Sequence, residues 1–429
     1  MSKKAHPWFF IPTLYFAEGV PYCIINTVSV IFYKRLGIEN TQITFWTSFL
    51  YLPWVLKMFW GPWLDLYSTK RNWIFFTQVF MVLILGGAAL FLRLPHFFLI
   101  TLLLFTLGAF ISATHDIAVD GFYLLSLSKD HQAMFVGIRS FFYRMAMIFG
   151  SGFLVYFAGK LEILLQNISL SWTVTLGCSA ILFIFLSLYH RLILPFPKED
   201  VSILLIQKEK TSWKKVFDSY FSQEKIGAIL AFILLYRLGE GMLVKMVSPF
   251  FLDLKEAGGL AMSTSQVGMV YGTFGVLALI LGGILGGVGL SKFGLKKCLW
   301  PMALALNLPD VFYVMIAYFT PSLTYIYPLV FLEQFGYGLG YSAFSVFLMR
   351  MATRREYPTS HFAISTGLMA LGMMIPGMIS GTLQKTFDYP HFFIIVCLAT
   401  LPGMLVIPFL PIEETSSNSL FNLKIKHQK

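Results

Sequence analysis

Long apolar stretches alternate with short polar segments along the whole chain. The hydrocarbon core of a bilayer is about 30 Å thick, so a spanning helix needs about 20 mostly apolar residues. Stretches of this kind lie near residues 9–32, 43–62, 73–93, 97–122, 134–158, 169–190, 226–250, 266–288, 298–319, 325–349, 360–383 and 391–411. The pattern therefore predicts an all-α membrane protein with twelve transmembrane helices.

A polar segment at 191–225 divides the predicted helices into two sets of six. We expect an N-terminal half at 1–190, a cytoplasmic linker at 191–225, a C-terminal half at 226–411 and a cytoplasmic tail at 412–429. The halves resemble each other, because Gly61, Asp65, Lys70 and Arg71 align at a constant offset with Gly287, Ser291, Lys296 and Lys297. Such repeats are typical of transporters that bind substrate between pseudo-symmetric halves.

The basic residues predict the orientation. Most of the 32 lysines and arginines lie in the N-terminus, the even-numbered loops, the linker and the C-terminus. Basic loops remain in the cytoplasm, so both termini are expected there. In a bacterium the protein would lie in the inner membrane.

Composition agrees with a membrane protein and excludes several functions. Hydrophobic residues make up 57% of the chain and charged residues 12%. The net charge of +11 does not indicate nucleic-acid binding, because the basic residues separate apolar runs. No metalloprotease, nucleophile-elbow or P-loop motif is present, so neither an enzyme nor an ATP-driven pump is expected. We also expect no cofactor and no metal site.

Charges within the apolar stretches are the first candidates for function, because they are costly in a bilayer. Glu18 lies roughly 15 Å deep at 1.5 Å per residue, and Arg144, Arg237 and Asp310 lie near the middle of their helices. Glu18 is a candidate for taking up a proton on one side of the membrane and releasing it on the other. The alternative is a fixed salt bridge to Arg144 or Arg237.

Two further groups of charges share a helix face. Asp116 and Asp120 are four residues apart, and Arg139 and Arg144 on the next helix can neutralise them. They form either a structural charge network or a site for protons or substrate.

Arg237 and Glu240 are three residues apart and can pair with each other or with neighbouring helices. Asp116, Glu18 and Glu240 are thus the candidates for proton coupling. Lys57 either extends its ammonium group to the membrane surface or faces an anionic substrate.

Several motifs resemble known transporters. The segment with Gly61, Asp65, Lys70 and Arg71 resembles the major facilitator signature between helices 2 and 3, in which glycine permits close helix approach and aspartate precedes basic residues. More specifically, four stretches resemble the AmpG muropeptide permease and acetyl-coenzyme A transporter family: Glu18 to Pro21, Leu52 to Lys57, Gly61 to Asp65 and Ala113 to Gly121. The chain departs from the family pattern at Glu18, His115 and Ser291.

The resemblance implies the major facilitator fold and either proton-linked uptake of anhydro-muropeptides or movement of acetyl-coenzyme A. Together with the intramembrane charges, it predicts a monomeric, proton-coupled transporter of an anionic or zwitterionic small molecule by alternating access. The alternatives are an uncoupled facilitator, a carrier of a siderophore-like or coenzyme-like solute, and a membrane sensor or scaffold.

Overall fold

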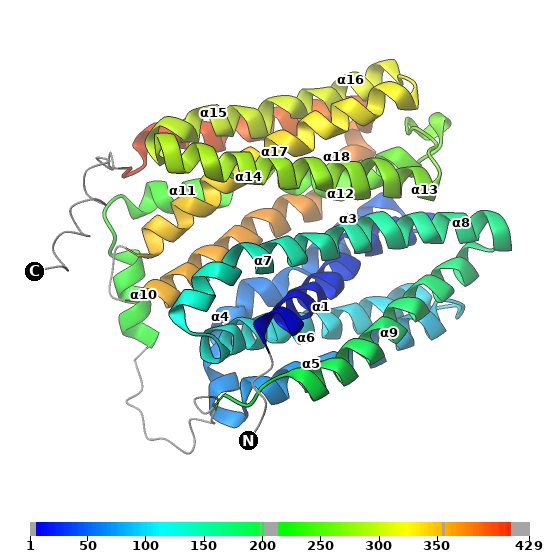
Figure 1. Ribbon diagram of the computed structural model, residues 1–429. Coiled ribbons are helices and arrows are strands. Elements are labelled where there is room, and N and C mark those ends of the chain that lie inside the picture. Colours follow the sequence, from blue (N-terminus) through cyan, green and yellow to red (C-terminus); the bar gives the residue numbers. More distant parts are fainter. Residues whose placement is uncertain (1–5, 198–199, 201–212, 354–356, 413–429) are drawn as a thin grey trace, which may run out of the picture.

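The computed structural model describes residues 6–197, 200, 213–353 and 357–412, apart from the side chains of residues 62, 63, 65, 66, 129, 130, 133, 213 and 359. The described residues form helices and no strand (Figure 1). The N-terminal half contains η1 (Pro7–Phe9), α1 (Ile11–Cys23), η2 (Ile24–Val28), α2 (Ser29–Arg35), α3 (Asn40–Phe49), α4 (Leu52–Tyr67), α5 (Lys70–Phe91), α6 (Phe97–Ser126), α7 (Lys129–Met147), η3 (Ile148–Leu154), α8 (Val155–Leu165) and α9 (Ile168–Ile193).

Helix α10 (Trp213–Phe221) belongs to the linker and packs against the C-terminal half. That half contains α11 (Ile226–Leu235), α12 (Leu238–Leu252), η5 (Lys255–Ala257), α13 (Thr264–Val267), η6 (Gly268–Gly275), α14 (Val276–Phe293), α15 (Leu295–Asn307), η7 (Leu308–Asp310), α16 (Val311–Phe319), α17 (Leu323–Ala352), α18 (Pro358–Val406) and η8 (Ile407–Phe409). The segments η2, η3 and η6 are π-helical.

Polar caps explain where several helices begin. The side chains of Thr69, Ser128 and Asn167 each accept a hydrogen bond from a backbone N–H in the first turn of α5, α7 or α9. Ser263 and Gln266 form a reciprocal capping box at α13. Because the first N–H groups of a helix have no partner inside the helix, these side chains stabilise its start.

Nine segments among the described residues are long and apolar enough to cross a membrane. One of them, Ser360–Phe409, is interrupted at Asp388, where φ is 60° and ψ is 180°. Two other long segments are not among the nine: the first consists of α3 and α4, and the second is α17. The all-α membrane architecture is confirmed, whereas the number of twelve crossings and the exact limits of the four regions stay predictions.

Leucines at intervals of four residues on α6 illustrate why the outer surface needs lipid. Leu99, Leu103 and Leu107 are each more than half exposed. Residues four apart lie on one helix face. This side of α6 is an apolar stripe suited to acyl chains rather than water.

The packing within the two halves is similar. In the N-terminal half, α1 packs on α7, and α5 packs on α6 and α9. In the C-terminal half, α12 packs on α18, and α15 packs on α17. Figure 1 shows α14 to α17 gathered on one side of the molecule and α1, α5, α6 and α9 on the other. Helix α18 contacts α3 and α4 across the interface, and η3 contacts η6.

Several contacts join the halves between the cavity and the end where α8 gives way to α9, which we call the distal end. A Cβ atom added at Gly272 of η6 would lie 1.9 Å from the carbonyl oxygen of Ser151 in η3. Asp253 of the C-terminal half pairs with Lys34 of the N-terminal half at 2.5 Å. Thr264 donates a hydrogen bond of 2.7 Å to Glu162, which also pairs with Arg35. Helix contacts and ion pairs therefore close the distal end.

Candidate functional site

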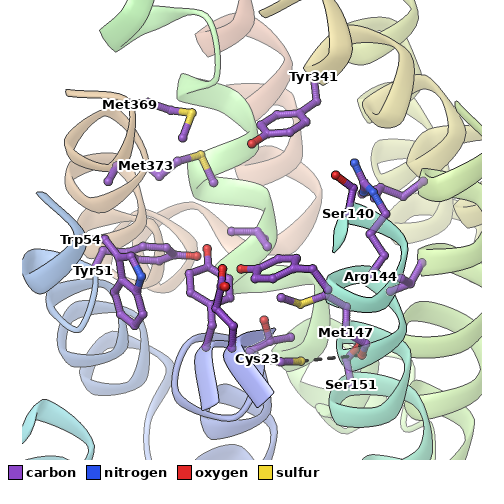
Figure 2. A pocket seen from close by; sticks show the side chains of 18 of the residues that line it. Cys23, Tyr51, Trp54, Ser140, Arg144, Met147, Ser151, Tyr341, Met369 and Met373 are labelled. Atoms are coloured by element: carbon purple, nitrogen blue, oxygen red, sulfur yellow. Dashed lines mark hydrogen bonds between the residues drawn. The ribbon is translucent and has the colours of Figure 1, made fainter. Parts of the chain in front are cut away.

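A cavity of about 550 Å³ lies between the two halves and is lined by residues from both. Its volume falls within the range of about 300–1,000 Å³ that is typical of small-molecule sites. Figure 2 shows Ser140, Arg144 and Met147 on one side of the cavity and Trp54, Met369 and Met373 on the other. Tyrosines contribute much of the remaining wall: Tyr15, Tyr22, Tyr51, Tyr143, Tyr271, Tyr337 and Tyr341.

Lys57 and Asp116 form an ion pair in the wall of this cavity. The ammonium nitrogen of Lys57 in α4 lies 2.5 Å from Oδ2 of Asp116 in α6. Both side chains are mostly buried, at 26% and 18% exposure. Lys57 thus donates to a carboxylate on the neighbouring helix and does not extend to the membrane surface.

A second polar cluster joins α1, α6 and α7. Oδ1 of Asp120 accepts hydrogen bonds from the hydroxyl of Tyr15 at 2.8 Å and from Nη1 of Arg139 at 3.1 Å. Arg139 also donates to the Tyr15 hydroxyl at 3.2 Å. Its guanidinium lies over the rings of Tyr15 and Tyr123. One of the two predicted counterions, Arg139, therefore meets Asp120.

Glu18 stands between these two pairs without a cation of its own. It is 8% exposed, and its Oε2 has no hydrogen-bond partner among the described residues. Its charged neighbours are Asp116, Asp120 and Lys57. The described part of this cluster thus holds three carboxyl groups and two cations. A buried unpaired carboxylate is costly, so the imbalance favours one bound proton.

Arg144 lines the cavity but does not neutralise the aspartates. Within the described part of the chain its guanidinium has no hydrogen-bond or ion-pair partner. It lies across the interface near Gly283 of α14, where an added Cβ would be 3.5 Å from Nη2. The fixed salt bridge between Glu18 and Arg144 is not formed. Arg144 is instead available to an anionic group in the cavity.

Arg237 approaches the cavity from the other half, at a break in the seventh apolar segment. Its backbone, at φ −112° and ψ 24°, separates α11 from α12. The guanidinium donates to the hydroxyl of Tyr337 and lies over the rings of Tyr337 and Tyr341. Glu240 lies in the first turn of α12, and the two side chains do not form an ion pair. The prediction of one continuous helix missed this break.

Asp310 does not reach the cavity wall. It lies behind it in η7, next to Glu240 and to Glu333 of α17. Sequence reasoning missed Glu333, although it too is a charge within an apolar stretch. It also missed Lys245, whose ammonium donates to the carbonyl oxygens of Asn26 and Thr47 across the interface.

The loop with Gly61, Asp65, Lys70 and Arg71, which the sequence predicts to be a gating loop, lies at the other end of the molecule from the distal contacts. The backbone N–H groups of Lys70 and Arg71 donate to the carboxylate of Asp200 at 2.7 and 3.0 Å. This carboxylate therefore caps the N-terminus of α5, where a negative charge is favourable. An added Cβ at Gly61 would touch only a methyl group at 3.9 Å, so no close helix approach requires glycine here. The side chain of Asp65 lies outside the described residues.

The chain matches known transporters over most of its length. The model of the Major Facilitator Superfamily matches residues 13–381. A putative transporter named AmpG 4 from Rickettsia conorii is 23% identical, covering 95% of this chain and 97% of the relative. The anhydromuropeptide permease of Escherichia coli K12 is also 23% identical, covering 91% and 77%.

A solved structure shares the fold. The D-xylose-proton symporter superimposes with a TM-score of 0.72 at 12% sequence identity, over 94% of this chain and 97% of that one. The packing of the helices, the cavity between the halves and the family match agree with one another. The chain belongs to the Major Facilitator Superfamily and is a secondary transporter with AmpG-type permeases among its relatives.

Proposed function

We propose that this transporter couples proton entry to uptake of an anionic or zwitterionic, muropeptide-like solute. The observation that carries the proposal is the cavity between the halves, where neither Arg144 nor Glu18 has an ion-pair partner among the described residues. One group is suited to a substrate anion and the other to a proton. Their common location lets the two ligands influence each other.

Arginines from both halves support the choice of an anionic solute. Arg144 and Arg237 both line the cavity. A carboxylate held between them would link the halves and favour the closed conformation of the cavity. The E. coli relative is named an anhydromuropeptide permease, and muropeptides carry carboxylates.

The carboxyl cluster supports proton coupling. Asp116 and Asp120 each have a cationic partner, whereas Glu18 does not. Protonation of Glu18 removes the surplus negative charge when the cavity is closed to water. Deprotonation becomes favourable when the cavity opens to the side of lower proton concentration.

The first experiment is uptake of a labelled anhydro-muropeptide into proteoliposomes, with and without an imposed pH gradient. We expect accumulation only with the gradient. Arg144→Ala should weaken apparent affinity about tenfold or more, because a charge-assisted hydrogen bond contributes about 1.5–3 kcal/mol. Arg237→Ala should weaken it similarly.

The matched control is Arg93→Ala, which removes an exposed arginine away from the cavity. It should leave uptake unchanged. Equal affinity of the wild type and both cavity variants would refute an arginine-bound anion. Absence of muropeptide uptake would refute that substrate, and peptides, siderophores and coenzyme-like anions would be tested next.

Two other functions would give different results in the uptake experiment. An uncoupled facilitator would equilibrate the solute without responding to the pH gradient. A membrane sensor or scaffold would transport none of these solutes. The unpaired charges in the cavity favour transport over a sensor, because unused charges within a membrane are costly.

The cellular arrangement completes the proposal. We propose a monomer with both termini in the cytoplasm, in the inner membrane of a bacterium. The distribution of lysine and arginine among the loops supports this orientation. An impermeant thiol reagent should then label a cysteine placed at exposed Glu256, on the distal end, from outside intact cells. Labelling only after lysis would show that the distal end faces the cytoplasm, which is the opposite orientation.

A further inference from the structure

Three buried carboxyl groups meet in the C-terminal half, outside the cluster around Glu18. Glu240, Asp310 and Glu333 come from α12, η7 and α17, and each offers an oxygen within 4.8 Å of the others. Their exposures are 3%, 2% and 0%. Glu240 also lines the cavity, whereas the other two lie behind it.

The hydrogen bonds at this cluster are incomplete. Glu333 accepts from the hydroxyl of Tyr313 at 3.0 Å and from the amide of Gln334 at 3.1 and 3.2 Å. In contrast, neither carboxyl oxygen of Asp310 has a partner among the described residues. Burying a carboxyl group without a partner is unfavourable. Asp310 therefore points to a ligand that supplies positive charge.

Charge counting gives the same result. Arg237 is the cationic side chain beside the cluster in the described part of the chain, and it already donates to Tyr337. The other polar groups around the carboxyls are neutral: Tyr271, Tyr313, Gln334, Tyr337 and Cys397. Three carboxylates and one guanidinium leave two negative charges in a medium where isolated charges are costly.

The helices are interrupted at the same place. The seventh apolar segment breaks at Arg237, three residues before Glu240. The ninth breaks at η7, which ends at Asp310 and contains Pro309. In transporters, interrupted helices bring backbone carbonyl groups and helix ends to ion sites that a continuous helix cannot form.

We propose that Glu240, Asp310 and Glu333 form a binding site for a hard metal cation of the Na⁺ or Ca²⁺ type. The donors are all oxygen atoms, which such cations prefer over softer transition metals. Because Glu240 belongs to both the cation site and the cavity wall, bound cation stabilises the C-terminal side of the cavity. A coupling role for this cation, beside the proton at Glu18, rests on the proposed function, whereas cation binding itself does not.

The test needs neither substrate nor membrane gradient, so its outcome is independent of the proposed function. The melting temperature of the purified full-length protein is measured in NaCl, in CaCl₂ and in choline chloride at equal ionic strength. We expect a saturable rise with one of the metal salts, since a ligand that binds only the folded state stabilises it. The cation that acts at lower concentration identifies the occupant.

The decisive variant is Glu240→Gln with Asp310→Asn and Glu333→Gln. These amides keep the shape of the carboxyl groups and remove their repulsion, so the variant should fold and lose the response to metal. The control replaces exposed Glu224, Asp218 and Glu256 in the same way and should respond as the wild type does.

Asp310→Asn alone provides a second test if the triple variant does not fold. Equilibrium binding of radioactive sodium or calcium to wild type and this variant should differ by at least about tenfold in affinity, which corresponds to about 1.4 kcal/mol. The proposal is refuted if the wild type responds equally to all three salts. It is also refuted if the variants that fold keep the metal response.

Discussion

Two pairs of charged side chains neutralise each other in the cluster around Glu18. Lys57 faces Asp116, and Arg139 faces Asp120. Glu18 has no counterion in the part of the chain that the structure describes. Paired charges cost less in a membrane than single ones. Glu18 is therefore the member of this cluster that we propose to bind and release a proton during transport.

Glu18→Gln tests this role at the residue scale. The amide resembles the neutral form of the carboxyl group and keeps its size, which matters because Gly19 next to it packs closely on Tyr143 and Ala146. We expect accumulation driven by a pH gradient to fall to about the level seen without a gradient. Exchange of labelled for unlabelled solute should persist.

Glu256→Gln is the control, because Glu256 is exposed at the distal end. Solute uptake by this variant should equal uptake by the wild type, with and without the pH gradient. Full gradient-driven accumulation by Glu18→Gln would show that the proton binds elsewhere.

At the scale of elements, π-helical segments lie where the halves cross. Segments η3 and η6 contact each other, and η2 contacts η3. π-helical turns are rare and often occur at functional sites. Here glycines allow the backbones of η3 and η6 to touch, so the local winding and the small residues together determine the spacing of the halves.

Gly272→Ala should therefore disturb the interface. Its new Cβ would lie 1.9 Å from a backbone oxygen of η3, which cannot move away as a flexible side chain can. We expect a loss of about 1–3 kcal/mol in stability, as for other overpacked positions. The loss should appear as a lower melting temperature of the purified protein.

Gly287→Ala in the same apolar segment is the matched control. Nothing lies within 4 Å of its added Cβ, and alanine favours helix more than glycine does. It should be neutral or stabilising. Equal melting temperatures of the two variants would contradict close packing at Gly272.

On the scale of the whole molecule, the two halves are held together at the distal end. Asp253 pairs with Lys34 and accepts hydrogen bonds from Asn40 and Tyr389 at 3.1 and 2.6 Å. Asn40 also donates to Gln384. This network connects α2 and α3 to the C-terminal half, so it must break before the cavity can open at this end.

Asp253→Asn should shift the population toward a conformation that is open at the distal end. Loss of a partly buried ion pair is worth about 1 kcal/mol, or several-fold in the ratio of two states. Spin labels at exposed Ile163 and Tyr325, in a chain with exposed Cys178 replaced by serine, report the separation of the halves. The longer distances should gain population.

A matched variant at the exposed Lys385–Glu39 pair controls for the loss of a surface charge. That pair spans the same end at 3.4 Å, but both side chains are 67% exposed. Glu39→Gln should leave the distance distribution nearly unchanged. The same distribution in Asp253→Asn and wild type would show that this ion pair does not hold the distal end closed.

The sequence by itself determined the membrane class, the positions of the apolar segments and most of the charges that matter. Apolar segments of bilayer length have no other stable environment, and each intramembrane charge is visible as an exception within them. The resemblance of short motifs was sufficient for the superfamily, which the family match confirms.

The tertiary structure decided which charges meet. Residues such as Lys57 and Asp116 are far apart in the chain, and their pairing depends on how α4 packs on α6. The break at Arg237 and the meeting of Asp310 with Glu333 are likewise visible only in the fold, because hydropathy does not encode them. The apolar pattern specifies which segments enter the membrane. Which charged side chains pair depends on the rotation and depth of each helix, and these are set by contacts between residues distant in sequence.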